Sequence, residues 1–137
     1  MKIEWAMACD GGEATPSGGL IALGLPIDTT WIDEFPADDF TLDVTLCIVT
    51  QNPPDGGTAH TMRYLVTDDA RRVVASLEFS TLATVFNDGA WPKDQPIRSW
   101  SLIRIPFPVS APGFFRVAIG LDDQEPVRFG HLVKRDE

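Results

Sequence analysis

The 137-residue sequence lacks the motifs by which most enzymes are recognised. It contains no G-x-S-x-G elbow, no P-loop, no G-x-G-x-x-G, no C-x-x-C and no H-E-x-x-H. Its two histidines, His60 and His131, have no spacing that would join them to a nucleophile oriented by a third group. We therefore expect a non-enzymatic protein without a cofactor, with both histidines on surface strands.

Cysteines and long apolar runs are also scarce. Cys47 falls on the polar side of its segment and Cys9 on the apolar side of its own, so we expect no disulfide, because a bridge needs both side chains in one layer. A reducing cytoplasm fits this usage best. No apolar run approaches the roughly 20 residues that span a bilayer, and the first residues alternate instead of forming a signal peptide. We expect a cytoplasmic protein that does not contact a membrane.

Positive charge is the third scarce property. Eleven basic residues stand against 20 acidic ones, which gives a net charge of −9. The basic residues are scattered, so nothing offsets the repulsion from a phosphate backbone, and we expect no nucleic-acid partner. The acidity otherwise favours solubility, and the expected partner is a protein or a second copy of the chain.

Period-two alternation is what the sequence has in abundance. Within residues 40–50, Leu42, Val44, Leu46 and Ile48 point to one side and polar residues to the other, as in a strand with one buried face. Similar segments predict a single domain over residues 1–137, an all-β, two-sheet antiparallel β-sandwich of seven to nine strands. The expected strands are 2–9, 20–25 (continuing over 27–32), 40–50, 58–67, 71–79, 100–107, 114–121 and 126–133.

The middle of the chain predicts a meander. The turn-rich segment 51–57 would join strands 40–50 and 58–67 in a hairpin, and strand 71–79 would follow. Trp5 and Trp100 fall within strands, and we expect them in the core.

Acidic pairs mark the ends of several expected strands. If strand 58–67 returns beside strand 40–50, Asp68 and Asp69 arrive at the same end as Asp38 and Asp39. Two carboxylate-rich loops at one end could bind Ca²⁺, which takes six to eight oxygen ligands. The alternative is that aspartate simply favours turns. Calorimetric titration with calcium separates the two interpretations.

Two aromatic residues bracket the irregular segment around residues 87–89. Phe86 and Trp91 would either plug the edge of the sandwich or anchor a partner. If Trp91 is an anchor, Trp91→Ala costs partner binding without lowering the melting temperature.

Several local patterns occur together: IEWAMACD at the start, GGLIALGLPIDTTW, then Phe35-Pro36, Pro106-Phe107-Pro108, Pro112 to Phe115, and Leu121-Asp122-Asp123. In this combination the chain resembles a family of small bacterial proteins of unknown function, over about residues 3–133. The resemblance implies an immunoglobulin-like sandwich in a bacterial cytoplasm and carries over no functional residue. The chain departs from the family pattern at Phe114, where a polar residue is more usual.

Three functions stay open at this point. The first is a protein-binding or scaffold module that acts through loops or an open edge strand. The second is a calcium-binding or metal-dependent module that uses the acidic loops. The third is a structural homo-oligomer subunit, favoured by outward positions for Leu65, Val74 and Ile103 in the expected register.

Overall fold

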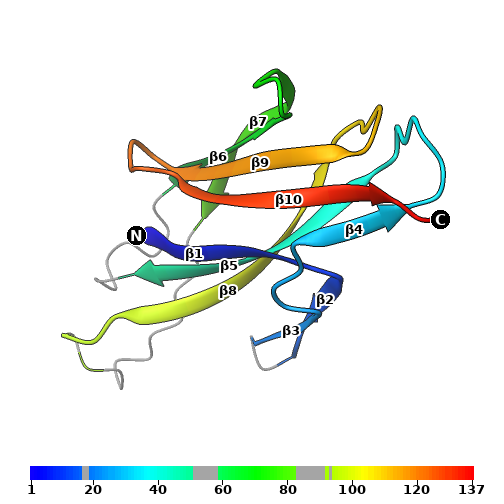
Figure 1. Cartoon of the computed structure of the whole chain (residues 1–137). Coiled ribbons are helices and arrows are strands. Elements are labelled where there is room, and N and C mark those ends of the chain that lie inside the picture. The colour runs from blue at the N-terminus through cyan, green and yellow to red at the C-terminus, as the bar shows by residue number, and fades with distance from the viewer. Residues whose placement is uncertain (17–18, 51–58, 83–91, 93) are drawn as a thin grey trace.

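A computed structural model describes residues 1–16, 19–50, 59–82, 92 and 94–137. These residues form ten strands and no helix, and the chain layers into two stacked sheets with one additional hairpin (Figure 1). The predicted β-sandwich is confirmed. Within the described ranges no helix long and apolar enough to cross a membrane is found.

The smaller sheet has three strands in the order β1 (Lys2–Cys9), β5 (Thr41–Thr50) and β8 (Ile97–Pro106). Both pairs are antiparallel, and β1 has a register shift between Ile3 and Trp5. The four apolar residues predicted to face inward from β5 are all buried in the core, so this prediction is confirmed.

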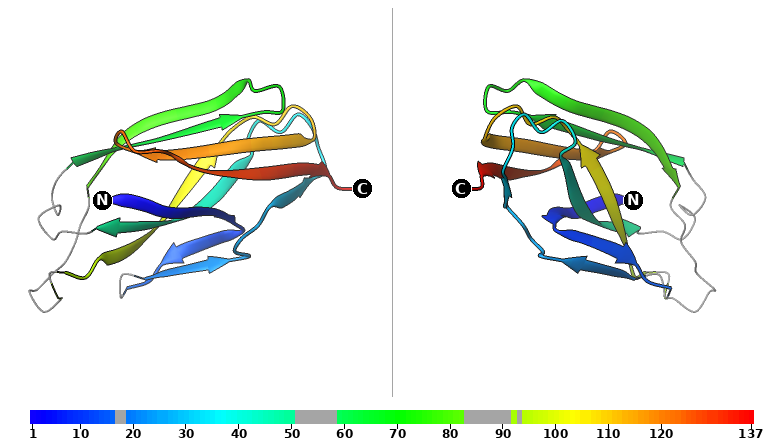
Figure 2. Two further views of the ribbon diagram at one scale, coloured as in Figure 1. Left: turned by 60° about the vertical axis from the view of Figure 1, so that its left-hand side comes forward. Right: turned by 90° about the vertical axis from the view of Figure 1, so that its right-hand side faces the viewer.

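The larger sheet has five strands in the order β4 (Thr29–Ile32), β10 (Val127–Arg135), β9 (Gly113–Leu121), β6 (Ala59–Thr67) and β7 (Val73–Leu82). It stacks over the smaller sheet, as the rotated views in Figure 2 show. All its pairs are antiparallel except β4 with β10, which is parallel. The expectation of purely antiparallel pairing is therefore wrong at this one edge.

A two-stranded hairpin of β2 (Gly11–Ala14) and β3 (Leu20–Leu23) forms a separate small sheet that contacts β8 (Figure 1). The sequence predicts a loop where β2 lies. A Cβ atom at Gly12 would come within 2.4 Å of the Ile21 carbonyl oxygen, so this position of the hairpin requires glycine.

The predicted hairpin between residues 40–50 and 58–67 is wrong. β5 pairs with β1 and β8, whereas β6 pairs with β7 and β9 in the other sheet. The chain therefore passes from one sheet to the other between Thr50 and Ala59. Turn residues at 51–57 indicate a change of direction, which a crossover between stacked sheets satisfies as well as a hairpin.

Trp5 and Trp100 lie on the outer face of the smaller sheet, so the expectation that they belong to the core is wrong. Trp5 and Trp100 both lie opposite Cys47 in register, and their ring centroids are 5.3 Å apart. They meet over Cys47, which is fully buried, while Trp100 itself is 43% exposed. The inward residues of β1 are Ala6 and Ala8 instead.

The two cysteines lie on the same face of the smaller sheet, so the reason given above for expecting no disulfide is wrong. Cys9 pairs with Asp43, four residues along β5 from Cys47, which separates the two by about 13 Å of strand. Both are free thiols.

Both histidines lie inside the protein, which corrects the expectation of surface positions. His131 is fully buried, and its Nε2 lies 2.8 Å from Thr30 Oγ1 of the neighbouring strand β4. The side chain of His60 is 11% exposed. Two other outward assignments, Val74 and Ile103, are also wrong, because both side chains pack against the core.

Candidate functional site

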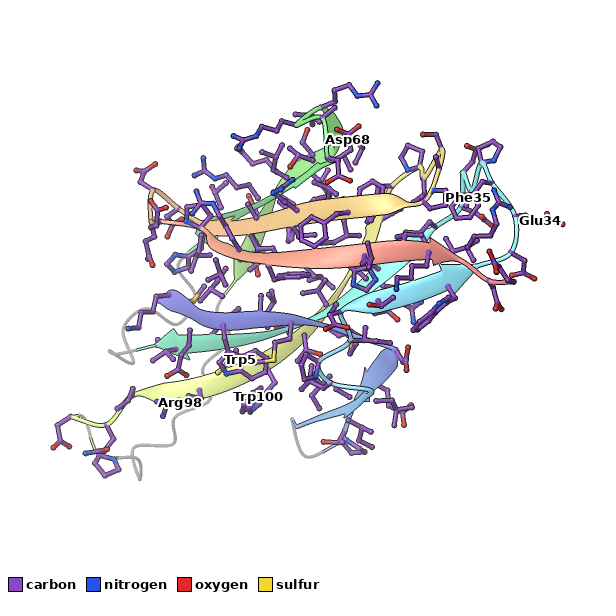
Figure 3. All side chains as sticks on the ribbon, in the orientation of Figure 1. Trp5, Glu34, Phe35, Asp68, Arg98 and Trp100 are labelled. Carbon is purple, nitrogen blue, oxygen red and sulfur yellow. The ribbon has the colours of Figure 1, made fainter. Side chains whose placement is uncertain are left out.

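The four aspartates of the calcium hypothesis lie at one end of the sandwich. The chain reaches Asp38 and Asp39 directly after Ala37, which bridges to Val109, and Asp69 Oδ2 accepts a hydrogen bond from Phe114 N at 3.1 Å. Figure 3 labels Asp68 at the turn between β6 and β7.

At this end, Asp68 bonds within its own turn, and Asp69 bonds to the start of β9. Asp68 accepts from Arg72 N and Arg72 Nε, each at 2.9 Å. The backbone bond from Arg72 is the main reason why the pKa of Asp68 is lowered. Within the described ranges no group of three or more histidine, cysteine, aspartate or glutamate side chains is arranged to hold a metal ion. These interactions match the turn-forming role of aspartate, and the calcium site stays a prediction.

The predicted partner anchors, Phe86 and Trp91, fall outside the described residues. That prediction is therefore untested. Two features of the described residues are candidate sites instead: the β7 edge of the larger sheet and the outer face of the same sheet.

Among the residues that the structure describes, strand β7 is an open edge of the larger sheet and pairs only with β6. Leu77 shares the inward face with its cross-strand neighbour Tyr64. Tyr64 is 8% exposed and Leu77 is 50% exposed. The side chain on β7 is much more exposed than its neighbour on β6 because the sheet of five strands is wider than the sheet of three strands that it covers. The inner face of β7 therefore extends past the edge of the smaller sheet.

The other edges of the two sheets are better protected. β8 carries Arg98 and Arg104 and ends at Pro106, and charge and proline both discourage edge pairing. The edge of β1 is engaged where Ala8 O accepts a hydrogen bond from Ile27 N at 2.8 Å. β4 is only four residues long. β7 spans ten residues with one charge and no proline.

The outer face of the same sheet is hollowed along β9. Two adjoining hollows of about 560 and 380 Å³ share Leu65, Ala118 and Arg128 in their linings. We call them together the trough, lined by residues of β6, β7, β9 and β10. Its floor is low because β9 turns Ala118 and Gly120 outward while it buries its alternate residues.

One end of the trough is formed by a stack of side chains from β9 on β10. A Cβ atom at Gly130 would lie 2.1 Å from Phe114 Cζ, so the Phe114 ring occupies the space above this glycine. The Arg116 guanidinium lies over the same ring, 5.1 Å from its centroid. Phe114 thus faces outward and packs on the sheet.

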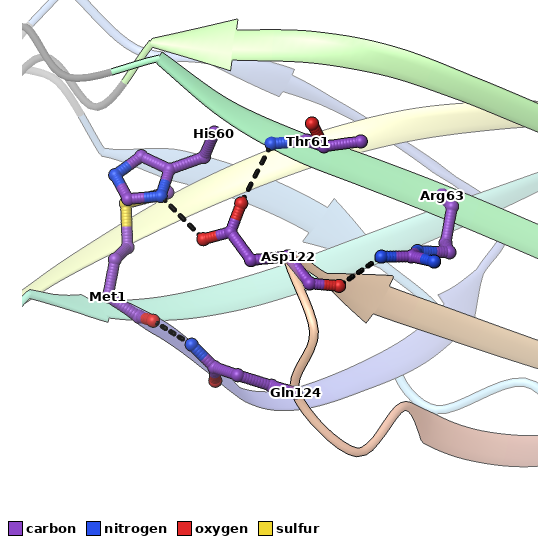
Figure 4. Close-up of polar contacts among 6 residues, drawn as sticks. All are labelled: Met1, His60, Thr61, Arg63, Asp122 and Gln124. Carbon is purple, nitrogen blue, oxygen red and sulfur yellow. Dashed lines mark hydrogen bonds and ion pairs between the residues drawn. The ribbon is translucent and has the colours of Figure 1, made fainter.

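A polar cluster fixes the β9–β10 turn near the other end of the trough (Figure 4). Asp122 has a positive φ of 51°, and its carboxylate lies 2.8 Å from His60 Nδ1 and accepts from Thr61 N at 3.0 Å. The hydrogen bond to His60 is the main reason why the pKa of Asp122 is lowered. Arg63 donates to the Asp122 carbonyl oxygen, and Gln124 Nε2 donates to Met1 O at 2.5 Å.

Sequence reasoning identified an open edge strand as a possible site but not which strand, and it missed the trough. A detectable signal was present, because the outward positions of segment 114–121 read Phe, Arg, Ala, Gly. Small residues on the exposed face of a central strand indicate a depression. Recognising it also required knowing that β6 and β10 flank β9.

Comparisons with known proteins give no family. No family model matches the chain, and no curated protein matches it. One similar solved structure is a glycosyl hydrolase family 2 member from Bacteroides cellulosilyticus, with a TM-score of 0.38 and 13% identity. The match covers 75% of this chain and 14% of that one, so the chain spans a small part of that protein's length.

Proposed function

We propose that this protein is a non-enzymatic binding module whose edge strand β7 accepts an extended segment of a partner protein. The observation that carries the proposal is the 50% exposure of Leu77 on the inward side of an unprotected ten-residue edge. Such edges present unpaired backbone donors and acceptors, and partner strands use them by adding to the sheet.

The edge also defines the pattern of its partner. The inward side of β7 presents Ala75, Leu77 and Phe79, while Ser76 and Glu78 face outward. An added strand would therefore carry apolar residues at alternate positions, over Leu77 and its inward neighbours, and polar residues between them. A basic residue opposite Glu78 would be favoured by cross-strand charge pairing.

The expected affinity is modest. Covering the exposed half of Leu77 contributes about 1 kcal/mol, since full burial of a leucine side chain is worth about 1.5–3 kcal/mol. Backbone hydrogen bonds add about 0.5–1.5 kcal/mol each. Contacts along one strand bury less than roughly 1,200 Å², which is typical of transient complexes.

The proposal is tested by selecting random dodecapeptides displayed on phage against the purified protein. Selected peptides should alternate apolar and polar residues, and they should slow amide hydrogen exchange in β7. Leu77→Lys places a charge on the docking face and should abolish binding of these peptides. Trp31→Lys is the matched control, because Trp31 is 57% exposed on β4, the opposite edge of the same sheet.

Peptides that protect another segment, or that bind Leu77→Lys as well as the unchanged protein, would refute strand addition at β7. Light scattering after size exclusion tests whether the edge is occupied by a second copy of the chain instead. A dimer that Leu77→Lys converts to a monomer would mean that the edge pairs with a second copy of the chain, and the homo-oligomer interpretation would replace the proposal.

A further inference from the structure

The trough on the outer face of the larger sheet concentrates positive charge on an acidic protein. Arg63, Arg116 and Arg128 line it, and Glu78 is the carboxylate in its lining. The whole chain has 20 acidic and 11 basic residues, so the lining of the trough reverses this ratio. Asp122 and Asp123 line a smaller hollow that adjoins the trough at Arg63.

Two of these arginines, Arg63 and Arg116, are in no ion pair among the described residues, although Arg63 stands opposite Glu78 in register. Arg63 donates to a neutral backbone carbonyl, and Arg116 lies over the Phe114 ring. Three arginines elsewhere on the protein are in ion pairs, namely Arg72 with Asp68, Arg98 with Glu4 and Arg104 with Asp43. Arg135 instead donates to the Asp33 carbonyl oxygen and lies over the Phe35 ring.

The geometry places the cations around an apolar floor. Arg63 stands beside Gly120 in register, and Arg128 stands beside Ala118 from the opposite wall. Arg128 pairs with Glu125 at 2.7 Å, but both side chains are well exposed. Exposed pairs contribute little, so Arg128 can exchange this partner for another anion. Leu65 and Pro126 supply apolar wall between the charges.

From these contacts we infer that the trough binds an organic anion with an extended apolar body, its acidic group between Arg63 and Arg128. The apolar part runs along Ala118 and Leu65 toward Phe114. The seven residues of β9 from Phe114 to Gly120 span about 20 Å, so a chain-like molecule fits better than a compact ion. This inference is independent of strand addition at β7.

The inference is tested by nuclear magnetic resonance titration of the whole protein with octanoate. Amide shifts at Ala118 and Gly120 should saturate with octanoate, while acetate and octanol should bind at least about tenfold more weakly, because each lacks one of the two recognised features. Equal binding of octanol would show that charge is not recognised, and equal binding of acetate that the apolar floor is not used. Either result overturns the inference.

Variants separate charge recognition from general damage. Arg63→Gln should weaken octanoate binding by about tenfold, and Glu78→Gln should strengthen it by removing a repulsive charge. Gly120→Ala should also weaken binding, because the added Cβ lies 3.4 Å from Arg63 Cγ and 3.7 Å from Pro126 Cβ and raises the floor without a clash.

Arg104→Gln makes the same chemical change on the smaller sheet and should leave binding unchanged. If Arg63→Gln and Arg104→Gln have equal effects, or if the saturating shifts lie away from β9, the trough is not the site.

Discussion

The contact between Gly130 and Phe114 predicts that the effect of Gly130→Ala on the unfolding free energy changes sign when the Phe114 ring is removed. Gly130→Ala brings a methyl group within 2.1 Å of Phe114 Cζ, so the ring must leave its place or the two strands must part. Overpacking of this kind costs about 1–3 kcal/mol of unfolding free energy. Phe114→Ala alone should cost about 2 kcal/mol, because the ring is half-buried and a core phenylalanine costs about 3–5 kcal/mol.

The double variant isolates the contact. Without the ring, alanine is favoured over glycine within a strand by about 0.5–1 kcal/mol. Gly130→Ala should therefore destabilise the unchanged protein and stabilise the Phe114→Ala protein. Urea unfolding followed by tryptophan fluorescence measures all four proteins, and a cost of 2 kcal/mol should shift the midpoint by roughly 1 M. If Gly130→Ala costs the same in both backgrounds, the ring does not occupy the space above the glycine.

Two further predictions concern buried titratable groups. Burial lowers the pKa of His131, so the unfolded chain takes up its proton first as the pH falls below about 6.5, and the unfolding free energy should decrease from pH 7 to pH 5. His131→Gln should reduce this slope in urea titrations; an unchanged slope would assign it to other groups. Burial and the nearby Glu4 carboxylate raise the pKa of Cys47 to about 11, so this thiol should resist a disulfide reagent at pH 8 until urea is added. Rapid labelling of native Cys47, located by mass spectrometry, would contradict its burial.

Alternation predicted the fold well where one face of a strand meets the core and the other meets water. The outward-facing Arg116 and Ala118 and the inward-facing Val117 and Ile119 of β9 follow this rule. Such strands fix the sandwich without any knowledge of strand order, because period-two burial depends only on neighbours along the chain.

The rule failed on the outer face of the smaller sheet, where both sides of β5 are buried. Thr45 is 1% exposed because Met7 and Leu102 flank it in register. Cys47 is covered in the same way by the two tryptophans that flank it. A polar residue on an alternating segment indicates an outer face, but only the cross-strand neighbours decide whether that face reaches solvent.

Strand order also explains why the site could not be located from sequence. The exposure of Leu77 comes from a difference in width between two sheets, and that difference arises because β5 and β6 separate instead of forming a hairpin. Had they paired, β7 would have continued the sheet that holds β5, and the present mismatch would not exist. The unprotected edge therefore depends on a crossover that turn-forming residues cannot distinguish from a tight turn, and the strand addition that we propose at this edge depends on the same crossover.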